Sequence, residues 1–314
     1  MTTPARTIFL GTGEFAVPIA DALAGISAID LVAVVTAPQR RGARGKLADS
    51  PVAGLAEARP IPMLRPERLR EAESVRQLAE LGPDLIVLAD YGQIVPQAIL
   101  DLPRHGALNL HPSLLPRHRG ATPIPASILA GDAETGVTLM LMDAGLDSGP
   151  IIAQRHHPMA GNETTPSLEP LLANLAANLL TDVLPAWLAG TIEPRPQPVE
   201  GVTLTRMLRR EDGRVDPTLG AARLERQVRA YQPWPGTFFE SPDGRVVIWK
   251  AGIAPASAPV GSIIAVGDQV PAIATSDGLL ELLEVQPAGG RRMTGAELLR
   301  GRPALDGARV DRPS

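Results

Sequence analysis

The chain has 314 residues, enough for two domains, and 44% of them are apolar, which excludes a disordered protein. It contains no cysteine, which excludes disulfides, thiolate nucleophiles and cysteine-bound zinc. A net charge of −4 argues against a generally basic nucleic-acid binder, although residues 203–314 hold fifteen Lys and Arg against thirteen Asp and Glu, which leaves room for a local RNA contact.

The N-terminal segment shows no export signal. Its apolar run, Ile8–Leu10, is too short for the core of a signal peptide. No later stretch approaches the roughly 20 apolar residues that a membrane span needs. The sequence therefore predicts a soluble protein that is not exported and does not meet a membrane, and a reducing cytoplasm fits the absence of cysteine.

The chain opens with the pattern of a βαβ unit. An apolar run at Thr7–Leu10 ends in Gly11–Gly13, Phe15–Leu23 has apolar residues at helical spacing, and Leu31–Val35 reads as a second strand. The glycine turn matches the dinucleotide fingerprint G-x-G-x-x-A, but the second strand is not followed by the acid that binds the ribose. Glu14 also lies where the pyrophosphate would approach. We therefore interpret the glycines as residues of a tight turn and disfavour a nicotinamide site.

Strands and helices continue to alternate beyond this unit. The continuous apolar run Leu85–Ala89 is typical of a buried parallel strand. Residues 167–188 carry an apolar helical stripe that indicates a core-packing helix. Together the pattern predicts an α/β fold with a doubly wound, mostly parallel sheet. The remaining expected elements are helices at 52–58 and 72–81 and strands at 106–110 and 136–142.

A proline-rich stretch, Gly190–Pro198, marks the expected domain boundary. We expect a first domain at 1–189, a linker at 190–202 and a second domain at 203–314. After a helix at 220–230, the second domain shows short strand-like runs separated by turn residues, which indicates a small C-terminal β-barrel of the oligonucleotide/oligosaccharide-binding (OB) type. These runs are 237–240, 246–250, 261–266, 272–275 and 279–285, and a capping-box pattern at Thr294–Glu297 opens a last short helix.

Three polar residues stand out against this framework. Asn109 and His111 are two positions apart on a short apolar strand, so both project to one face. They lie at the carboxyl end of a parallel strand, where such sheets bind ligands. Asp147 follows the strand 136–142 in a glycine-rich loop, and we expect it to meet His111 at that sheet end. Taken alone, the histidine would be a structural residue, and the aspartate would cap its own turn.

An Asn, a His and an Asp at one sheet end suit acyl transfer from an amide-like donor to an amine. The tetrahedral intermediate develops a negative oxygen, for which the Asn109 amide and a His111 imidazolium can act as donors. Protons must leave the attacking nitrogen and reach the leaving nitrogen. An adjacent carboxylate would raise the pKa of His111, which suits it to this exchange.

Several segments resemble the methionyl-tRNA formyltransferase family. They are GTGEFA (11–16), ADYG (89–92), LNLHPSLLPRHRGATPI (108–124), GDAETGVTLMLMDAGLDSGPI (131–151), YQPWPGT (231–237) and VQPAGGRRMTGAELL (285–299). The resemblance spans nearly the whole chain. It implies that the protein transfers a formyl group from 10-formyltetrahydrofolate to methionyl initiator tRNA, with Asn109, His111 and Asp147 as the catalytic trio.

The resemblance also implies the binding residues. The folate pocket is lined by Ser113, Leu114, Leu115 and Pro116, together with Ala89, Tyr91 and Gly92. A loop with Arg40, Arg41, Arg44 and Lys46 reaches the acceptor end of the tRNA, and the second domain grips the rest of the acceptor arm. No metal and no obligate protein partner are implied.

Two residues depart from the family pattern. Pro112 follows His111 where many members have Gly, and Met207 stands where a Lys is expected, which puts one tRNA contact in doubt. The main alternative is another 10-formyltetrahydrofolate-dependent formyltransferase or hydrolase acting on a small amine or on water. Glycinamide ribonucleotide transformylases share the trio but have no use for residues 203–314.

Overall fold

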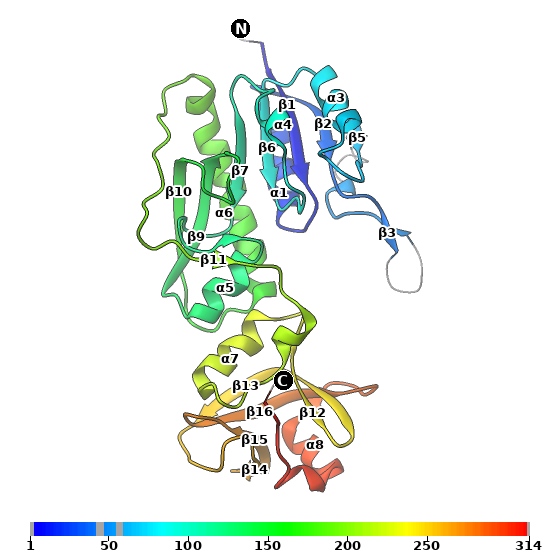
Figure 1. The fold of residues 1–314 in the computed structure, drawn as a ribbon, viewed down its shortest axis with the longest axis vertical. Helices are drawn as coiled ribbons and strands as arrows, with labels where there is room; N and C mark the ends of the chain where they lie inside the picture. Colours follow the sequence, from blue (N-terminus) through cyan, green and yellow to red (C-terminus); the bar gives the residue numbers. More distant parts are fainter. Residues whose placement is uncertain (1–2, 42–46, 55–58, 313–314) are drawn as a thin grey trace. The chain divides into compact units, whose positions relative to one another are not determined.

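The computed structural model describes residues 3–41, 47–54 and 59–312 (Figure 1). The chain forms two compact units, each made of more than one segment. The first unit comprises Met1–Pro123, Glu134–Pro158 and Glu169–Arg206, and the second comprises Ile124–Ala133, Met159–Leu168 and Met207–Ser314.

A seven-stranded sheet forms the centre of the first unit, in the order β10-β9-β7-β6-β1-β2-β5. Five neighbouring strands, from β7 to β5, are parallel, whereas β9 runs antiparallel to both β7 and β10. The predicted α/β class with a mostly parallel sheet is therefore confirmed. The strands are β1 (Ala5–Gly11), β2 (Ile29–Val35), β5 (Met63–Leu64), β6 (Leu85–Ala89), β7 (Ala107–His111), β9 (Glu134–Leu141) and β10 (Ile151–Pro158).

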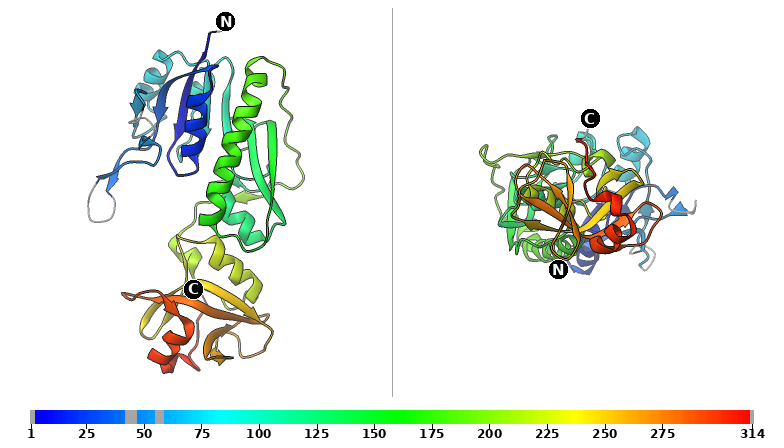
Figure 2. Two further views of the ribbon diagram at one scale, coloured as in Figure 1. Left: turned by 180° about the vertical axis from the view of Figure 1, so that it is seen from behind. Right: turned by 90° about the horizontal axis from the view of Figure 1, so that it is seen from below.

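Helices cover both faces of this sheet. One face of β1, β2 and β6 packs against α3 (Ala72–Glu80) and α4 (Gln97–Leu100) in a single apolar core. Figure 2 shows α1 (Ala16–Gly25) and α6 (Thr165–Leu188) on the opposite face. Every residue of β6 and β7 is buried, because helices above and below exclude water from central parallel strands. Of the helix expected at 52–58, residues 55–58 lie outside the described part of the chain.

Helix α6 contradicts the expectation that no segment is long and apolar enough to span a membrane. Its most apolar window has a mean hydropathy of 1.4, because leucine and alanine make up half of the helix. Leu172, Ala176 and Leu180 are nevertheless fully buried and repeat every four residues. This spacing gives the helix a core-packing face, and the core helix of a protein meets the same length and composition criteria.

The second unit contains a curled antiparallel sheet in the order β12-β13-β16-β15-β14, with β17 paired to β16. This half-barrel confirms the predicted barrel-like C-terminal fold. Its core joins strand residues with those of α7 (Ala221–Ala230) and α8 (Gly295–Gly301), and Thr294 caps α8 as its sequence predicts. The strands are β12 (Thr237–Ser241), β13 (Gly244–Ala254), β14 (Ile263–Val266), β15 (Val270–Ala274), β16 (Leu279–Pro287) and β17 (Met293–Thr294).

Short elements complete the described chain. The strand β8 (Arg119–Gly120) pairs in parallel with β11 (Leu204–Thr205), so the segment that follows the proline-rich stretch lies along the loop after β7. Helix α5 (Pro123–Ala130) follows β8. The others are the hairpin of β3 (Arg40–Arg41) with β4 (Leu47–Ala48) and the 3-10 helices η2 (Arg210–Gly213) and η3 (Pro303–Leu305).

Candidate active site

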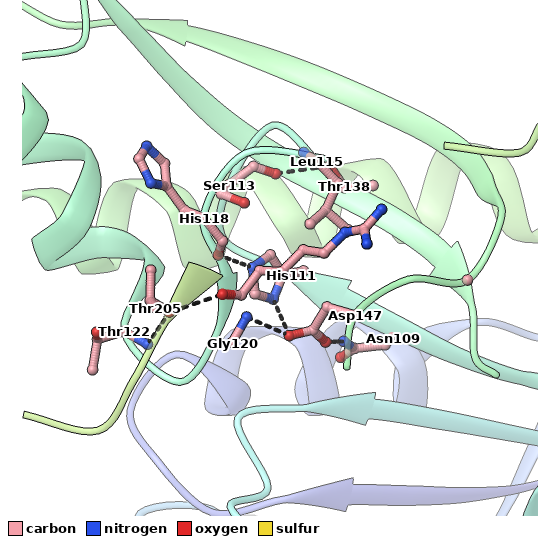
Figure 3. A network of polar contacts seen from close by, with 12 residues as sticks. Asn109, His111, Ser113, Leu115, His118, Gly120, Thr122, Thr138, Asp147 and Thr205 are labelled. Carbon is pink, nitrogen blue, oxygen red and sulfur yellow. Dashed lines mark hydrogen bonds and ion pairs between the residues drawn. The ribbon is translucent and has the colours of Figure 1, made fainter. Parts of the chain in front are cut away.

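Strand β7 places Asn109 and His111 on one face of the sheet, two residues apart, as predicted. Both residues are only 5% exposed. A buried amide and a buried imidazole are costly unless they find hydrogen-bond partners. Figure 3 shows that both point toward the carboxylate of Asp147.

The Asp147 carboxylate joins the two β7 residues. Its Oδ1 accepts a hydrogen bond of 3.3 Å from Asn109 Nδ2, and its Oδ2 lies 3.7 Å from His111 Nδ1. The backbone N–H of Gly120 donates to the same Oδ2 at 2.8 Å (Figure 3). The structure thus brings the three predicted residues together and adds a backbone donor that the sequence analysis missed.

Asp147 was expected to follow a strand that ends at the same edge of the sheet as β7, and the structure shows a different route. Because β9 is antiparallel to β7, the carboxyl end of β9 lies beside the amino end of β7, where Leu141 pairs with Leu108. The loop after β9 must therefore fold back toward His111. Gly149 permits this return, because a Cβ there would lie 1.8 Å from the carbonyl oxygen of Leu141. The predicted contact is present, but a shared sheet end does not produce it.

Two residues of the site have left-handed backbone conformations. The φ angles of Asp147 and His118 are +47° and +58°. A residue with a Cβ adopts this region at some cost, so such angles persist where the surroundings impose them, and they concentrate at functional sites. Here the two residues supply the carboxylate and the carbonyl that contact His111.

The hydrogen bonds of His111 define its tautomer. Its Nε2 lies 2.9 Å from the carbonyl oxygen of His118. A carbonyl oxygen only accepts, so Nε2 carries a hydrogen and donates it. In the neutral ring, Nδ1 then presents a lone pair toward the Asp147 carboxylate. Two hydrogen-bond acceptors, the Nδ1 lone pair and the carboxylate, therefore face each other, and this arrangement favours binding of a proton between them.

Burial lowers the pKa of His111, while the Asp147 carboxylate and the His118 carbonyl raise it by smaller amounts. The net shift of the pKa is downward, because the free energy lost when the imidazolium is desolvated exceeds the attraction that the single carboxylate provides. The predicted raising effect of Asp147 is present, but burial, which the sequence analysis did not consider, lowers the pKa of His111 more strongly. Burial thus favours the neutral form of the ring, which can accept a proton at Nδ1.

The loop that follows His111 is fixed to β9. The Thr138 hydroxyl accepts from the backbone N–H of Leu115 at 3.0 Å and donates to the Ser113 carbonyl at 2.7 Å (Figure 3). Gln154 Nε2 donates to the Leu115 carbonyl at 2.9 Å. Ser113 and Leu115 are buried, and the Ser113 hydroxyl donates to the Arg117 carbonyl. Of the predicted folate-lining residues in this loop, Leu114 and Pro116 are the half-buried ones.

The other predicted folate residues lie after β6. Ala89 is buried at the end of that strand, and Gly92 is exposed with a φ of +76°. Tyr91 is 3% exposed and packs in the core beneath the sheet, where burial raises the pKa of its hydroxyl to about 12. Its side chain therefore helps to fix the turn from the core side.

The glycine turn after β1 is closed by the Asp90 backbone. The N–H groups of Thr12 and Gly13 donate to the Asp90 carbonyl at 2.9 and 3.4 Å, and the Asp90 carboxylate occupies the space beside Gly13. Burial and the Asp90 and Glu14 carboxylates raise the pKa of Glu169. A pyrophosphate would meet occupied donors and negative charge here, which agrees with interpreting the glycines as residues of a tight turn.

The predicted RNA-contacting loop is described only in part. Arg40 and Arg41 form β3, whereas Arg44 and Lys46 lie outside the described residues. Met207, at the position of the expected lysine, is 76% exposed. Within the described ranges, no group of three or more His, Cys, Asp or Glu side chains is arranged to hold a metal ion.

Comparisons with known proteins agree with this architecture. Residues 5–184 match the family described as formyl transferase, and residues 207–303 match the formyl transferase C-terminal domain. The chain is similar to the methionyl-tRNA formyltransferase of Myxococcus xanthus DK1622, with 41% identity over 96% of this chain and 97% of that protein. It is also similar to the methionyl-tRNA formyltransferase of Halorhodospira halophila SL1, with 44% identity over 98% and 99%.

A solved structure shares the fold at lower identity. It is an N-formyltransferase from Helicobacter canadensis in complex with folinic acid and dTDP-3-aminofucose. The TM-score is 0.67 at 18% identity, over 89% of this chain and 99% of that one.

Proposed function

The chain belongs to the methionyl-tRNA formyltransferase family, and on this basis we propose that Asn109, His111 and Asp147 carry out its reaction. That reaction transfers the formyl group of 10-formyltetrahydrofolate to the amino group of methionyl initiator tRNA. The observation that carries the proposal is the Asp147 carboxylate, which contacts the Asn109 amide and faces the His111 ring.

The transfer needs one oxyanion donor and one proton relay. The amine nitrogen attacks the formyl carbon, the C=O electron pair moves to oxygen, and the bond between the formyl carbon and N10 of the folate then breaks. The attacking nitrogen loses one proton and N10 gains one, so no net proton is consumed. Any group that takes the first proton can return it as the second.

Asn109 is the proposed oxyanion donor. A side-chain amide has two N–H groups, and one of them is held by Asp147 at 3.3 Å. This contact fixes the plane of the amide and directs its second N–H. A donor fixed in advance stabilises developing negative charge without reorganising during the reaction.

The His111–Asp147 pair is the proposed proton relay. Neutral His111 presents the Nδ1 lone pair to the carboxylate 3.7 Å away, and a proton taken from the amine is stabilised between them. The hydrogen bond from Nε2 to the His118 carbonyl holds the ring while this exchange takes place. The relay returns the proton to N10 when the intermediate collapses.

We further propose that the folate ring contacts the half-buried side chains of Leu114 and Pro116, while buried Ser113 and Leu115 maintain the loop shape. Support comes from the anchoring of this loop to β9 by Thr138, beside the trio. The turn at Ala89, Tyr91 and Gly92 completes the proposed folate site. A cytoplasmic location and the absence of an obligate protein partner stay predictions.

A transfer assay tests the function. Purified protein with 10-formyltetrahydrofolate should formylate charged initiator tRNA, and charged elongator tRNA should react at least tenfold more slowly in kcat/KM, an order-of-magnitude expectation for about 1.4 kcal/mol of discrimination. Free methionine, amino sugars and water serve as competing acceptors. Formylation of a small amine, or hydrolysis of the donor, at a higher kcat/KM than tRNA formylation would contradict the proposal.

We propose that the loop carrying Arg40, Arg41, Arg44 and Lys46 contacts the tRNA. Replacing all four with alanine should raise KM for charged initiator tRNA, because arginine and lysine hold phosphates and unstacked bases of single-stranded ends. It should also flatten the salt dependence, since each lost phosphate contact removes about 0.7–0.9 from the log–log slope. KM for the folate should stay unchanged. Unaltered tRNA kinetics across a salt series would show that the loop does not bind RNA.

A further inference from the structure

The proline-rich segment before the second unit lies against the loops that build the active site. Residues 195–205, which we call the strap, belong to the first unit. At one end, Arg195 exchanges two backbone hydrogen bonds with Ile151, at 2.7 and 2.8 Å. At the other end, β11 pairs with β8 in the loop after His111. The strap has the composition of a linker, but it is hydrogen-bonded to the loops that build the active site.

Gln197 connects the two catalytic loops through opposite ends of one amide. Its Oε1 accepts from Arg119 Nε and Nη2, at 3.0 and 2.8 Å. Its Nε2 donates to the carbonyl oxygens of Asp147 and Gly149, each at 2.8 Å. The acceptor end thus holds the loop after β7, and the donor end holds the loop that carries the Asp147 carboxylate.

The rest of the strap fixes the backbone groups that contact the catalytic pair. Thr203 Oγ1 accepts from the His118 N–H at 2.8 Å, and the carbonyl of His118 in turn accepts from His111. Thr205 Oγ1 donates to the Arg119 carbonyl at 3.0 Å, next to the Gly120 N–H that donates to Asp147. Gly120, with a φ of +106°, admits β11 because a Cβ there would lie 2.2 Å from the Thr205 carbonyl oxygen.

We propose that Gln197 is a positioning residue for formyl transfer, which sets the placement of Asp147 relative to His111 by joining their two loops. The inference rests on the proposed roles of that pair. Arg119 and Gln197 contact neither ring nor carboxylate of the trio in these hydrogen bonds, so their effect on the reaction passes through Asp147 and through the His118 and Gly120 backbone.

The pKa of His111 depends on whether the Asp147 carboxylate is in place. The charged or titratable groups that act on it are Asp147, which raises its pKa, and His118, whose charge lowers it. Displacement of Asp147 weakens the attraction that offsets burial. Loss of the Gln197 link is therefore expected to lower the pKa of His111, a change that a general loss of folded protein would not produce.

The test compares Gln197→Ala and Gln197→Glu with the matched control Gln97→Ala. Gln97 lies on α4 of the same unit, and its side chain donates to Asp101. Gln197→Glu keeps an acceptor for Arg119 but replaces the donor that faces the Asp147 and Gly149 carbonyls. It therefore preserves the hydrogen bonds to Arg119 and removes those to the loop of Asp147. Both Gln197 variants should lose about tenfold or more in kcat with both KM values within about twofold, because small displacements of reacting groups cost up to about 10²-fold.

NMR titration of His111 should show a lower pKa in Gln197→Ala, which adds no charge, and the acidic limb of its pH–rate profile should move with it. A kcat within about twofold of wild type, or a loss of kcat with an unshifted His111 pKa, overturns the inference. Full activity of Gln197→Glu would also overturn the inference, because the hydrogen bonds to Arg119 would then be sufficient without those to the loop of Asp147. His111→Ala separates the two proposals, since wild-type transfer by that variant contradicts the catalytic trio itself.

Discussion

Replacing Asn109 by alanine is expected to lower kcat about 10²- to 10³-fold, since removal of one oxyanion donor costs about 2.7–4 kcal/mol of transition-state stabilisation. KM for both substrates should change little, because the interaction forms fully only in the tetrahedral intermediate. The side chain is 5% exposed, so the truncation also leaves a small void on β7. Circular dichroism and thermal unfolding must therefore accompany the kinetics.

A matched control is Asn174→Ala, which removes an exposed amide from α6 whose hydrogen bond goes only to the Pro170 carbonyl. It should keep wild-type kcat. The double variant Asn109→Ala/Asp147→Asn distinguishes two explanations. If Asn109 served only to hold Asp147, the double variant would be no slower than Asp147→Asn alone, whereas a separate oxyanion role makes it slower. A folded Asn109→Ala protein with kcat within threefold of wild type would remove this residue from the mechanism.

Local sequence patterns predicted Asn109 and His111 because both lie on a short, regular strand. Asn109 and His111 alternate with buried leucines on β7, and period-two alternation places both on one face whatever the rest of the sheet does. The direction of β9 was not accessible in the same way. An apolar strand buried on both faces reads alike in either direction, and only the pairing of Leu141 with Leu108 establishes that β9 is antiparallel.

The hydrogen-bonding groups that complete the site could not be predicted from the pattern of side chains. The carbonyl of His118 and the N–H of Gly120 are backbone groups. Every residue type supplies such a carbonyl, and every type except proline supplies such an N–H. Gln197 lies among prolines in a stretch whose composition indicates a linker. Its importance comes from contacts with Arg119 and Asp147, which are 78 and 50 positions away in the chain. Long-range pairing of this kind is invisible to local propensity.

The sign of the His111 shift also required the structure. The sequence indicated a neighbouring carboxylate, and that carboxylate does raise the pKa of His111. Burial acts in the opposite direction and is the larger effect, because the residue is only 5% exposed. Proximity to a charge can be inferred from a motif, but the loss of hydration depends on everything that covers the group.

Replacing Asp147 by asparagine is expected to lower kcat about 10²-fold or more, which is the usual contribution of a positioned acid–base group. The substituted side chain is nearly the same size, so the loop after β9 should keep its path. Its amide oxygen can still accept from the Gly120 N–H, which donates at 2.8 Å to the native carboxylate. What disappears is the negative charge 3.7 Å from His111 Nδ1.

The effect on pH dependence has a definite sign. Asp147 raises the pKa of His111 against the larger lowering by burial, so removal of its charge must lower that pKa further. Activity requires neutral His111 as the proton acceptor, and the acidic limb of the pH–rate profile should therefore shift to lower pH while the plateau falls.

NMR titration of His111 in both proteins measures the first effect, and kcat/KM across pH measures the second. An unchanged or higher His111 pKa in Asp147→Asn would mean that the carboxylate does not act on the ring electrostatically. In that case the role of Asp147 would reduce to holding the Asn109 amide in place for the oxyanion.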